Sequence, residues 1–231
     1  GNGISIDEWL TYASPESLSY FMYQKPKTAK RMYFDVIPKA VDEYHQQLRA
    51  YDTQDLKSKA TNPIFHIHGY NVPKSDMVVP FSMLLNLAAV ANVEDREQLW
   101  GFIKRYAQDA TPENNPQLDQ AVSFAISYYN DFVKPQKVYR LPNSIEREAL
   151  TDLRNMLIDF KGSLDAEELQ SIVFACGREK FDPLRDWFKA LYEVLLGASQ
   201  GPRFGGFIAL YGIEETVQLI EKALDGIFVK D

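Results

Sequence analysis

The sequence predicts an all-α fold, and three observations support this prediction. Apolar residues recur at spacings of three and four along most of the chain, which is typical of amphipathic helices. Side chains that cap helix N-termini stand directly before several of these stripes. Convincing alternation of apolar and polar residues, the pattern of a half-buried strand, does not occur. We therefore expect little or no sheet.

The first sixty or so residues are expected to form a small helical module. Ser5 and Glu8 match the S-x-x-E capping box, in which each side chain satisfies a free backbone N–H at the helix start. A second helix start follows at Ser14, with Pro15 in the first helical position. A long helix is expected from about Pro38, with an apolar stripe formed by Ile37, Val41, Tyr44, Leu48 and Tyr51. Residues 1–62 are assigned to this module.

Residues 63–231 are assigned to a second, larger helical domain. Residues 61–80 are expected to be a looped connection, because they contain three prolines and a glycine. The nearly continuous apolar segment 81–90 is expected to be a buried helix. Further helices are expected near residues 95–106, 118–133, 143–160, 165–176, 182–196, 207–211 and 214–224. The glycine-rich segment 201–206 lacks the spacing of a phosphate-binding loop and is interpreted as a turn between helices.

Composition limits the possible function classes. Hydrophobic residues make up 45% and charged residues 25% of the 231 positions, which are ordinary values for a globular protein. No run of 18 uninterrupted apolar residues occurs, so no membrane span is expected. Cys176 is the single cysteine, which excludes an intramolecular disulfide and a cysteine metal cluster. We expect it to be a small buried apolar side chain.

Positive charge is concentrated near the start of an otherwise acidic chain. The whole chain carries a net charge of −7, but residues 21–40 contain five Lys or Arg and one acidic residue. Four of these cations, Lys25, Lys27, Lys30 and Arg31, fall within seven positions around Pro26. A patch of this density in an acidic protein indicates a local site for a polyanion.

Two histidines in the predicted connection are candidate metal ligands. On a strand, His66 and His68 would share one face and could bind a metal ion. No Cys, Asp or Glu stands within seven residues of either histidine on the same segment to complete the ligand set. We therefore predict no metal site and interpret this segment as structural or as facing a substrate.

The first forty residues resemble a known family. The run GNGISIDEWLTYASPESLSYFMYQKPKTAKRMYFDVIP is similar to the segment that directly follows the KMSKS signature of class I lysyl-tRNA synthetases. The resemblance continues over most of the chain, at residues 62–69 (NPIFHIHG), 84–87 (LLNL), 128–135 (YYNDFVKP), 195–197 (LLG) and 201–205 (GPRFG). We therefore identify the chain as similar to the C-terminal half of such an enzyme.

The resemblance implies an architecture and a function. It implies a stem-contact-like module in residues 1–62 and an α-helix cage that binds the anticodon stem-loop in residues 63–231. It also implies that the full-length enzyme charges tRNA(Lys) with lysine in the cytoplasm, using ATP with Mg²⁺. The catalytic motifs of the family would precede Gly1, in an N-terminal catalytic domain on the same polypeptide. The isolated fragment is therefore expected to have no catalytic residues, no cofactor of its own and no activity.

Two alternatives remain open from the residues alone. One is a helical protein-interaction scaffold without RNA binding, in which the basic patch is a solvated face. The other is a hydrolase built on His66 and His68. A salt series of tRNA binding separates the first alternative from RNA binding, because phosphate neutralisation gives a steep dependence on salt.

Candidate RNA contacts were assigned in two groups. The first group comprises Lys25, Lys27, Lys30 and Arg31, which are expected to contact phosphates of the tRNA stem. The second group is expected to contact the anticodon loop, since unpaired bases are held by aromatic stacking and arginine contacts. It comprises Arg178, Lys180, Arg185, Arg203 and Phe204, with Phe181 and Tyr211 nearby.

Overall fold

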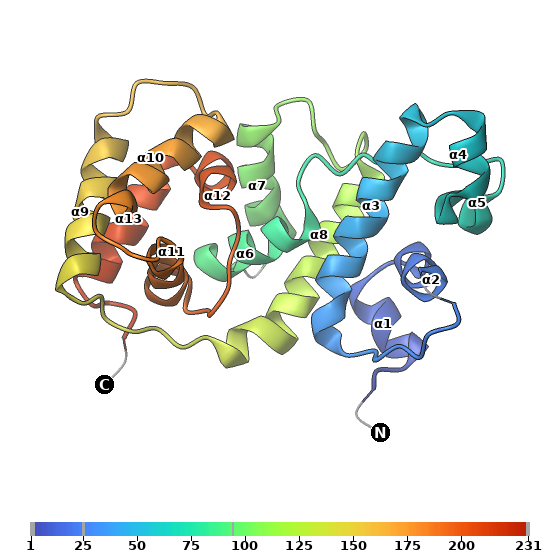
Figure 1. Cartoon of the computed structure of the whole chain (residues 1–231), viewed down its shortest axis with the longest axis horizontal. Helices are drawn as coiled ribbons and strands as arrows, with labels where there is room; N and C mark the ends of the chain where they lie inside the picture. The colour runs from blue at the N-terminus through green and yellow to red at the C-terminus, as the bar shows by residue number, and fades with distance from the viewer. Residues whose placement is uncertain (1–2, 25, 94, 230–231) are drawn as a thin grey trace. The chain divides into compact units, whose positions relative to one another are not determined.

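The computed structural model describes residues 3–24, 26–93 and 95–229. Every regular element within these residues is a helix, so the predicted all-α class is confirmed (Figure 1). Within the same residues, no helix is both long enough and apolar enough to cross a lipid bilayer. The helix-cage architecture that the resemblance implies stays a prediction.

Helix starts that the sequence predicts are present with their caps. Ser5 accepts a hydrogen bond from the Glu8 N–H at 3.2 Å, and the Glu8 carboxylate accepts one from the Ser5 N–H at 2.6 Å. The Ser14 hydroxyl accepts a hydrogen bond from the Ser17 N–H at 3.2 Å and so caps the next helix, which has Pro15 in its first turn. Asn143 and Glu146 form a second capping box at the start of a later helix. Local sequence therefore sets these boundaries.

The chain divides into two compact units, each described here by itself. The first unit contains residues 1–85 and 109–132. Its helices are α1 (Ile6–Tyr12), α2 (Pro15–Tyr23), η1 (Phe34–Val36), α3 (Ile37–Thr53), α4 (Leu56–Thr61), α5 (Pro63–His68) and α8 (Pro116–Tyr128). Helix α6 (Phe81–Ala91) begins in this unit, and the π-helical turn η2 (Tyr129–Val133) follows α8.

The first unit extends beyond the predicted boundary at residue 62. Helix α1 packs against α8, which lies more than a hundred residues later in the chain. Tyr12 of α1 donates a hydrogen bond to the Asp131 carboxylate at 2.8 Å. Packing therefore joins residues 1–62 to a later segment. The assignment of stem contacts to residues 1–62 and of anticodon contacts to residues 63–231 stays a prediction.

Residues 61–80 differ from the looped connection that was expected. Asn62 accepts a hydrogen bond from the Ile64 N–H at 2.9 Å, and Pro63 occupies the first turn of helix α5. The helix ends at Gly69, whose φ of 63° lies in the left-handed region that favours glycine. The prediction was wrong for residues 63–68, because Asn62-Pro63, which is a loop signal, acts here as a helix start. Residues 69–80 form the expected connection without a helix.

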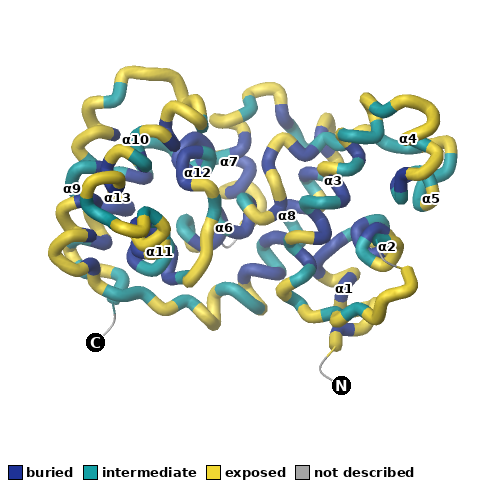
Figure 2. The backbone as a smooth tube through the Cα atoms, in the orientation of Figure 1, coloured by how far each residue is buried: buried dark blue, intermediate teal, exposed yellow. Residues whose placement is uncertain are grey.

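The second unit contains residues 86–108 and 133–231. Its helices are α7 (Arg96–Tyr106), η3 (Lys134–Gln136), α9 (Ser144–Ile158), α10 (Ala166–Arg178), α11 (Arg185–Leu191), η4 (Tyr192–Leu196), α12 (Phe204–Tyr211) and α13 (Ile213–Leu224). Helix α12 packs against α10, and α13 packs against α9 (Figure 1). Figure 2 shows α12 buried along most of its length, whereas no residue of α4 in the first unit is buried.

Gly205 permits the close packing of α10 and α12. A Cβ atom placed on Gly205 would lie 2.2 Å from the Ala166 carbonyl oxygen and 2.5 Å from the Gln170 backbone nitrogen. The Gly205 N–H also donates to the Gln170 side chain at 2.7 Å. Because two of the three nearest atoms belong to the backbone, a methyl group here would force the helices apart.

We therefore expect Gly205→Ala to lower the free energy of unfolding of the second unit by about 1–3 kcal/mol or more, through overpacking. Gly101 in α7 is the matched control, since nothing lies within 4 Å of its added Cβ. Gly101→Ala should raise stability by about 0.5–1 kcal/mol, because alanine loses less backbone entropy in a helix. Urea unfolding followed by circular dichroism measures both. Equal effects of the two variants would contradict the close packing.

Candidate functional site

The predicted stem-contact cations lie on the loop between α2 and η1. Lys27 and Arg31 are exposed, whereas Lys30 is partly covered. Lys25 lies outside the described residues. The Ile4 N–H donates to the Met32 carbonyl at 2.8 Å, so the loop is held against the segment that precedes α1. The structure thus presents Lys27 and Arg31 at the surface on an anchored loop.

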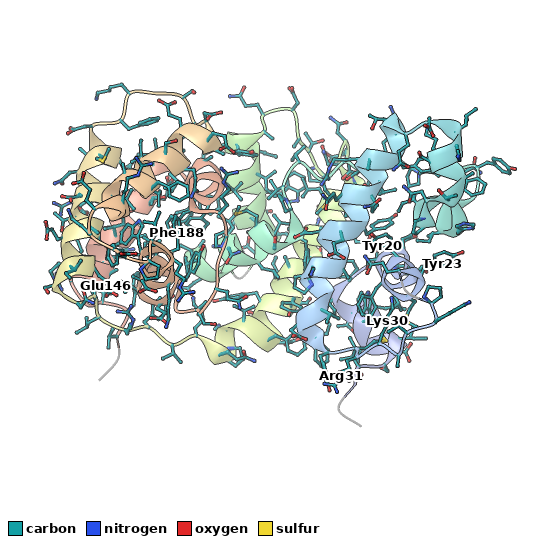
Figure 3. All side chains as sticks on the ribbon, in the orientation of Figure 1. Tyr20, Tyr23, Lys30, Arg31, Glu146 and Phe188 are labelled. Carbon is teal, nitrogen blue, oxygen red and sulfur yellow. The ribbon has the colours of Figure 1, made fainter. Side chains whose placement is uncertain are left out.

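Lys30 turns back onto the protein. Its ammonium group donates a hydrogen bond to the Phe21 carbonyl and lies 4.8 Å from the centroid of the Phe21 ring. Figure 3 shows Lys30 and Arg31 at different positions along the loop. A phosphate contact by Lys30 would have to compete with these contacts. Lys27 and Arg31 are therefore the better placed of the described cations.

His66 and His68 do not share a face, because they lie on helix α5 and not on a strand. Two residues apart on an α-helix are separated by roughly 200° around the axis. His66 stacks on Tyr23 of α2, with ring centroids 5.1 Å apart and planes at 19°. The His68 Nε2 atom lies 2.8 Å from the Tyr44 hydroxyl. The hydrolase built on this pair therefore lacks a common site for both imidazoles.

Within the described residues, no three His, Cys, Asp or Glu side chains are placed to hold a metal ion. The expectation that no metal is bound stays a prediction.

A small cavity with both apolar and polar lining residues lies beside His68 in the first unit. Its volume is ≈ 170 Å³, and its lining includes Glu16, Tyr44, His45, His68 and Gln117. This volume is below the usual range for ligand pockets, roughly 300–1,000 Å³. Burial lowers the pKa of His68, while the nearby Glu16 carboxylate opposes that shift. The cavity combines hydrogen-bonding groups with room for several ordered waters or one small molecule about the size of benzene.

His45 is a buried polar residue that the sequence analysis did not single out. Its Nδ1 atom lies 2.9 Å from the Ser75 hydroxyl. Burial, together with the charge of Arg49, lowers the pKa of His45 to about 4. The signal was available, because position 45 follows Val41 by four residues and precedes Leu48 by three, which places it beside the apolar stripe.

The predicted anticodon residues do not form one cluster. Arg203 donates to the Glu167 carboxylate at 2.6 Å, near the first turn of α10. Arg178 is the last residue of the same helix. Eleven residues of α-helix separate Glu167 from Arg178, which is about 16 Å along the axis. Arg203 therefore lies at the opposite end of α10 from Arg178.

Phe204 is fully buried and offers no ring face to a base. It packs against Phe207 in the core of the second unit, with ring centroids 5.3 Å apart. Its proposed stacking role is therefore corrected to a structural one. The signal was present in the sequence, since residues 204–211 are apolar nearly throughout.

Lys180 is engaged by carboxylates of α9. Its ammonium group lies 3.0 Å from Asp152 and 3.5 Å from Glu148. The neighbouring Phe181 stacks on the buried Trp187, with ring centroids 5.4 Å apart. Lys180 thus anchors the turn after α10, and its charge is largely compensated.

Arg178 and Arg185 flank an aromatic pair that the sequence analysis missed. Phe174 of α10 and Phe188 of α11 meet edge to face at 5.2 Å, and both are half-buried. Phe188 is labelled in Figure 3. Arg178 follows Phe174 by four residues and Arg185 precedes Phe188 by three, so each arginine shares a helix face with one ring. The side chain of Arg185 is 85% exposed. This group could hold an unpaired base by stacking and arginine contact.

Comparison with known proteins agrees with the resemblance. Residues 1–71 match the sequence model of a family described as tRNA synthetases class I (K). Over all 231 residues, the chain is 71% identical to a lysine–tRNA ligase of Roseobacter denitrificans, of whose length it covers 44%. The chain is homologous to class I lysyl-tRNA synthetases. The family resemblance is thereby confirmed.

More distant relatives carry the same name. Over 227 residues, the chain is 47% identical to a lysine–tRNA ligase of Rickettsia conorii and 48% identical to one of Rickettsia bellii. Each match covers 97% of this chain and 44% of the relative. The chain therefore spans less than half the length of the synthetases it matches. The family-model match includes the basic loop and helices α4 and α5.

The buried His45 predicts a loss of stability in acid. The unfolded chain takes up its histidine proton near pH 6.5, whereas the folded chain does so only near pH 4. Because the unfolded state binds the extra proton between these values, the free energy of unfolding should fall as the pH drops through this window. The contribution is about 3 kcal/mol at pH 4.

His45→Gln should remove this contribution and flatten the pH dependence, measured by urea unfolding between pH 4 and 7. His66→Gln, which removes an exposed histidine from the same unit, provides the comparison. An unchanged slope in His45→Gln would show that the proton is taken up elsewhere.

Proposed function

We propose that this chain is the tRNA-binding, C-terminal part of a lysine–tRNA ligase. The observation that carries the proposal is the 71% identity to a lysine–tRNA ligase over every residue of the chain. The proposed substrate of the full-length enzyme is tRNA(Lys), which it charges with lysine in the cytoplasm. Catalysis is assigned to an N-terminal domain in cis.

The charges of the first unit support a phosphate contact. Lys27 and Arg31 are exposed on a loop anchored through Met32, in a chain of net charge −7. Cations held together at a surface repel one another unless a polyanion is nearby. Each phosphate that they neutralise releases counterions, which makes binding depend on salt. We assign these two residues, with Lys25 and Lys30 beside them, to the tRNA stem.

The aromatic and arginine residues of the second unit support a contact to unpaired bases. The proposed group is Arg178 and Arg185 with the half-buried rings of Phe174 and Phe188. Lys180 holds the adjoining turn through Asp152. Arg203 lies at the other end of α10, so any contact that it makes to the RNA is separate from that of Arg178 and Arg185. We assign the first group to the anticodon loop.

ATP with Mg²⁺ is assigned to the full-length enzyme alone. The part of this chain that the structure describes provides no three metal-ligating side chains in one place.

The double variant Lys27→Gln and Arg31→Gln should weaken tRNA binding and flatten its salt dependence. For a paired stem, each lost phosphate contact reduces the slope of log K against log salt by about 0.9, so two contacts reduce it by about 1.8. Filter binding of a lysine tRNA transcript over a salt series measures the slope. An interaction scaffold without RNA binding would give no steep slope at all.

The matched control is the double variant Lys39→Gln and Lys104→Gln, which removes the same charge from exposed positions outside the loop. Lys39 lies 3.7 Å from Glu43 on its own helix. The control should leave the slope close to that of the parent chain. If both double variants reduce the slope equally, the effect reports net charge and not a phosphate contact.

Arg178→Ala and Arg185→Ala should each lower the affinity for the lysine anticodon stem-loop by about 1–3 kcal/mol if they hold bases. The affinity for a stem-loop with a scrambled loop should change little, because phosphate contacts remain. Arg203→Ala is the comparison at the far end of α10 and should have the smaller effect. Fluorescence anisotropy with the two labelled stem-loops measures all three. Equal losses on both stem-loops would assign the arginines to the backbone.

A further inference from the structure

Two segments of the first unit carry positive charge and no carboxylate. Residues 17–34 contain four Lys or Arg and no Asp or Glu. Residues 56–75 contain three Lys and again no Asp or Glu. In a chain of net charge −7, two such segments are a departure from the average composition. Only the first of them was considered as an RNA contact above.

The fold brings these two segments together. Helix α2 from the first segment packs against α5 from the second (Figure 1). Tyr20, Tyr44 and Ile64 form the buried core beneath this contact, together with Leu48. At the surface, Tyr23 stacks on His66, with ring centroids 5.1 Å apart. Tyr23 is labelled in Figure 3. The two segments therefore meet along one edge, which we call the α2–α5 edge. Glu16, in the first turn of α2, is a carboxylate beside this edge and lies near His68.

Aromatic rings continue along the α2–α5 edge. Phe65 contacts His66 at 5.9 Å on one side and Tyr70 at 5.4 Å on the other, measured between ring centroids. Tyr23 is 43% exposed and Tyr70 is 95% exposed. Tyr70 follows the turn at Gly69 and presents nearly its whole ring to solvent. An exposed ring of this kind offers a free face for stacking.

The carboxylates that border the second segment are already engaged. Asp55 accepts a hydrogen bond from the Ser58 N–H at 2.7 Å and caps α4. Asp52 lies 3.5 Å from the Lys74 ammonium group. Lys57 lies on the exposed helix α4, two residues after Asp55, whose carboxylate accepts from the backbone at the helix start. The edge therefore combines positive charge with planar side chains.

We propose that the α2–α5 edge binds unpaired nucleotides of RNA, with bases stacked on Tyr70 and on the Tyr23–His66 pair. Lys57 contacts the phosphates between these bases, and Lys27 keeps its proposed contact to the stem. Positive charge with exposed aromatic faces is the combination that holds single-stranded nucleic acid. Bases within a duplex are already stacked and would not reach these rings. The proposal rests on the proposed tRNA binding and adds a second type of contact to it.

The test uses the 231-residue chain and a labelled single-stranded RNA of twelve nucleotides, with the same RNA annealed to its complement as the paired probe. Tyr70→Ala should weaken single-strand binding by about five- to 150-fold, the range expected from the loss of one stacked base. Duplex binding should change by less than about twofold, because the phosphate contacts remain. Tyr70→Phe keeps the ring and should restore single-strand binding.

Two further variants keep the test specific. Tyr23→Leu removes the ring that stacks on His66 and should also weaken single-strand binding. Tyr106 of α7, in the other unit, is 43% exposed, as Tyr23 is. Tyr106→Ala should therefore leave single-strand binding unchanged. Circular dichroism establishes that each variant is folded. Wild-type binding by both Tyr70→Ala and Tyr23→Leu would overturn the proposal.

The outcomes separate this inference from the proposed function. In one outcome, the lysine tRNA transcript binds in a salt-dependent way, but the tyrosine variants do not change single-strand binding. That result supports the proposed tRNA binding and overturns the proposed nucleotide site on the α2–α5 edge. In another outcome, single-strand binding depends on the tyrosines, but the transcript does not bind. That result supports the nucleotide site on the α2–α5 edge and overturns the proposed tRNA binding. Binding to phosphatidylserine vesicles that depends on Tyr70, without single-strand binding, would assign the edge to a membrane surface and overturn the proposal.

Discussion

The backbone N–H groups at helix starts constrain the first unit, because they have no partner within their own helix. Residues distant in sequence satisfy two of these starts. Asp42 of α3 accepts hydrogen bonds from the N–H groups of Phe81 and Ser82 at 2.6 and 3.1 Å, at the start of α6. Asp76 accepts from Gln117 and Leu118 at 3.0 and 2.9 Å, at the start of α8. These contacts hold the segment after α5 in place, and with it Ser75, the partner of His45.

The second unit depends on a close helix contact and on a buried carboxylate. Gly205 lets α12 approach α10 closely, and this packing buries Phe204. Glu146 of α9 accepts hydrogen bonds from Arg140 at 2.7 and 2.8 Å, and Arg140 also donates to Glu193 at 2.6 Å. Although burial alone would raise the pKa of Glu146, the hydrogen bonds from Arg140 and Asn143 lower it. The carboxylate therefore stays charged. Arg140, in the segment before α9, links it to Glu193 of η4.

The net charge of the chain does not describe how its charges are distributed over the surface. Most carboxylates near the candidate cations of the second unit are paired with them, as Asp152 is with Lys180 and Glu167 with Arg203. Lys27 and Arg31 instead lie in a segment without acidic residues. Exposed pairs contribute little to stability, so the paired cations can exchange partners at small cost. An acidic protein can bind a polyanion under these conditions, provided that its free cations are gathered on one surface.

The sequence by itself determined the helical class, the helix starts at Ser5, Ser14 and Asn143, and the density of cations near Pro26. These features depend on residues three or four positions apart, whose proximity helix geometry guarantees. Only the tertiary structure decided that Asp42 and Asp76 cap distant helices, that Tyr23 meets His66, and that Arg178 and Arg203 lie at opposite ends of α10. These contacts join residues far apart in the chain. Which distant surfaces meet is determined by the packing of whole helices, and local spacing carries no information about it.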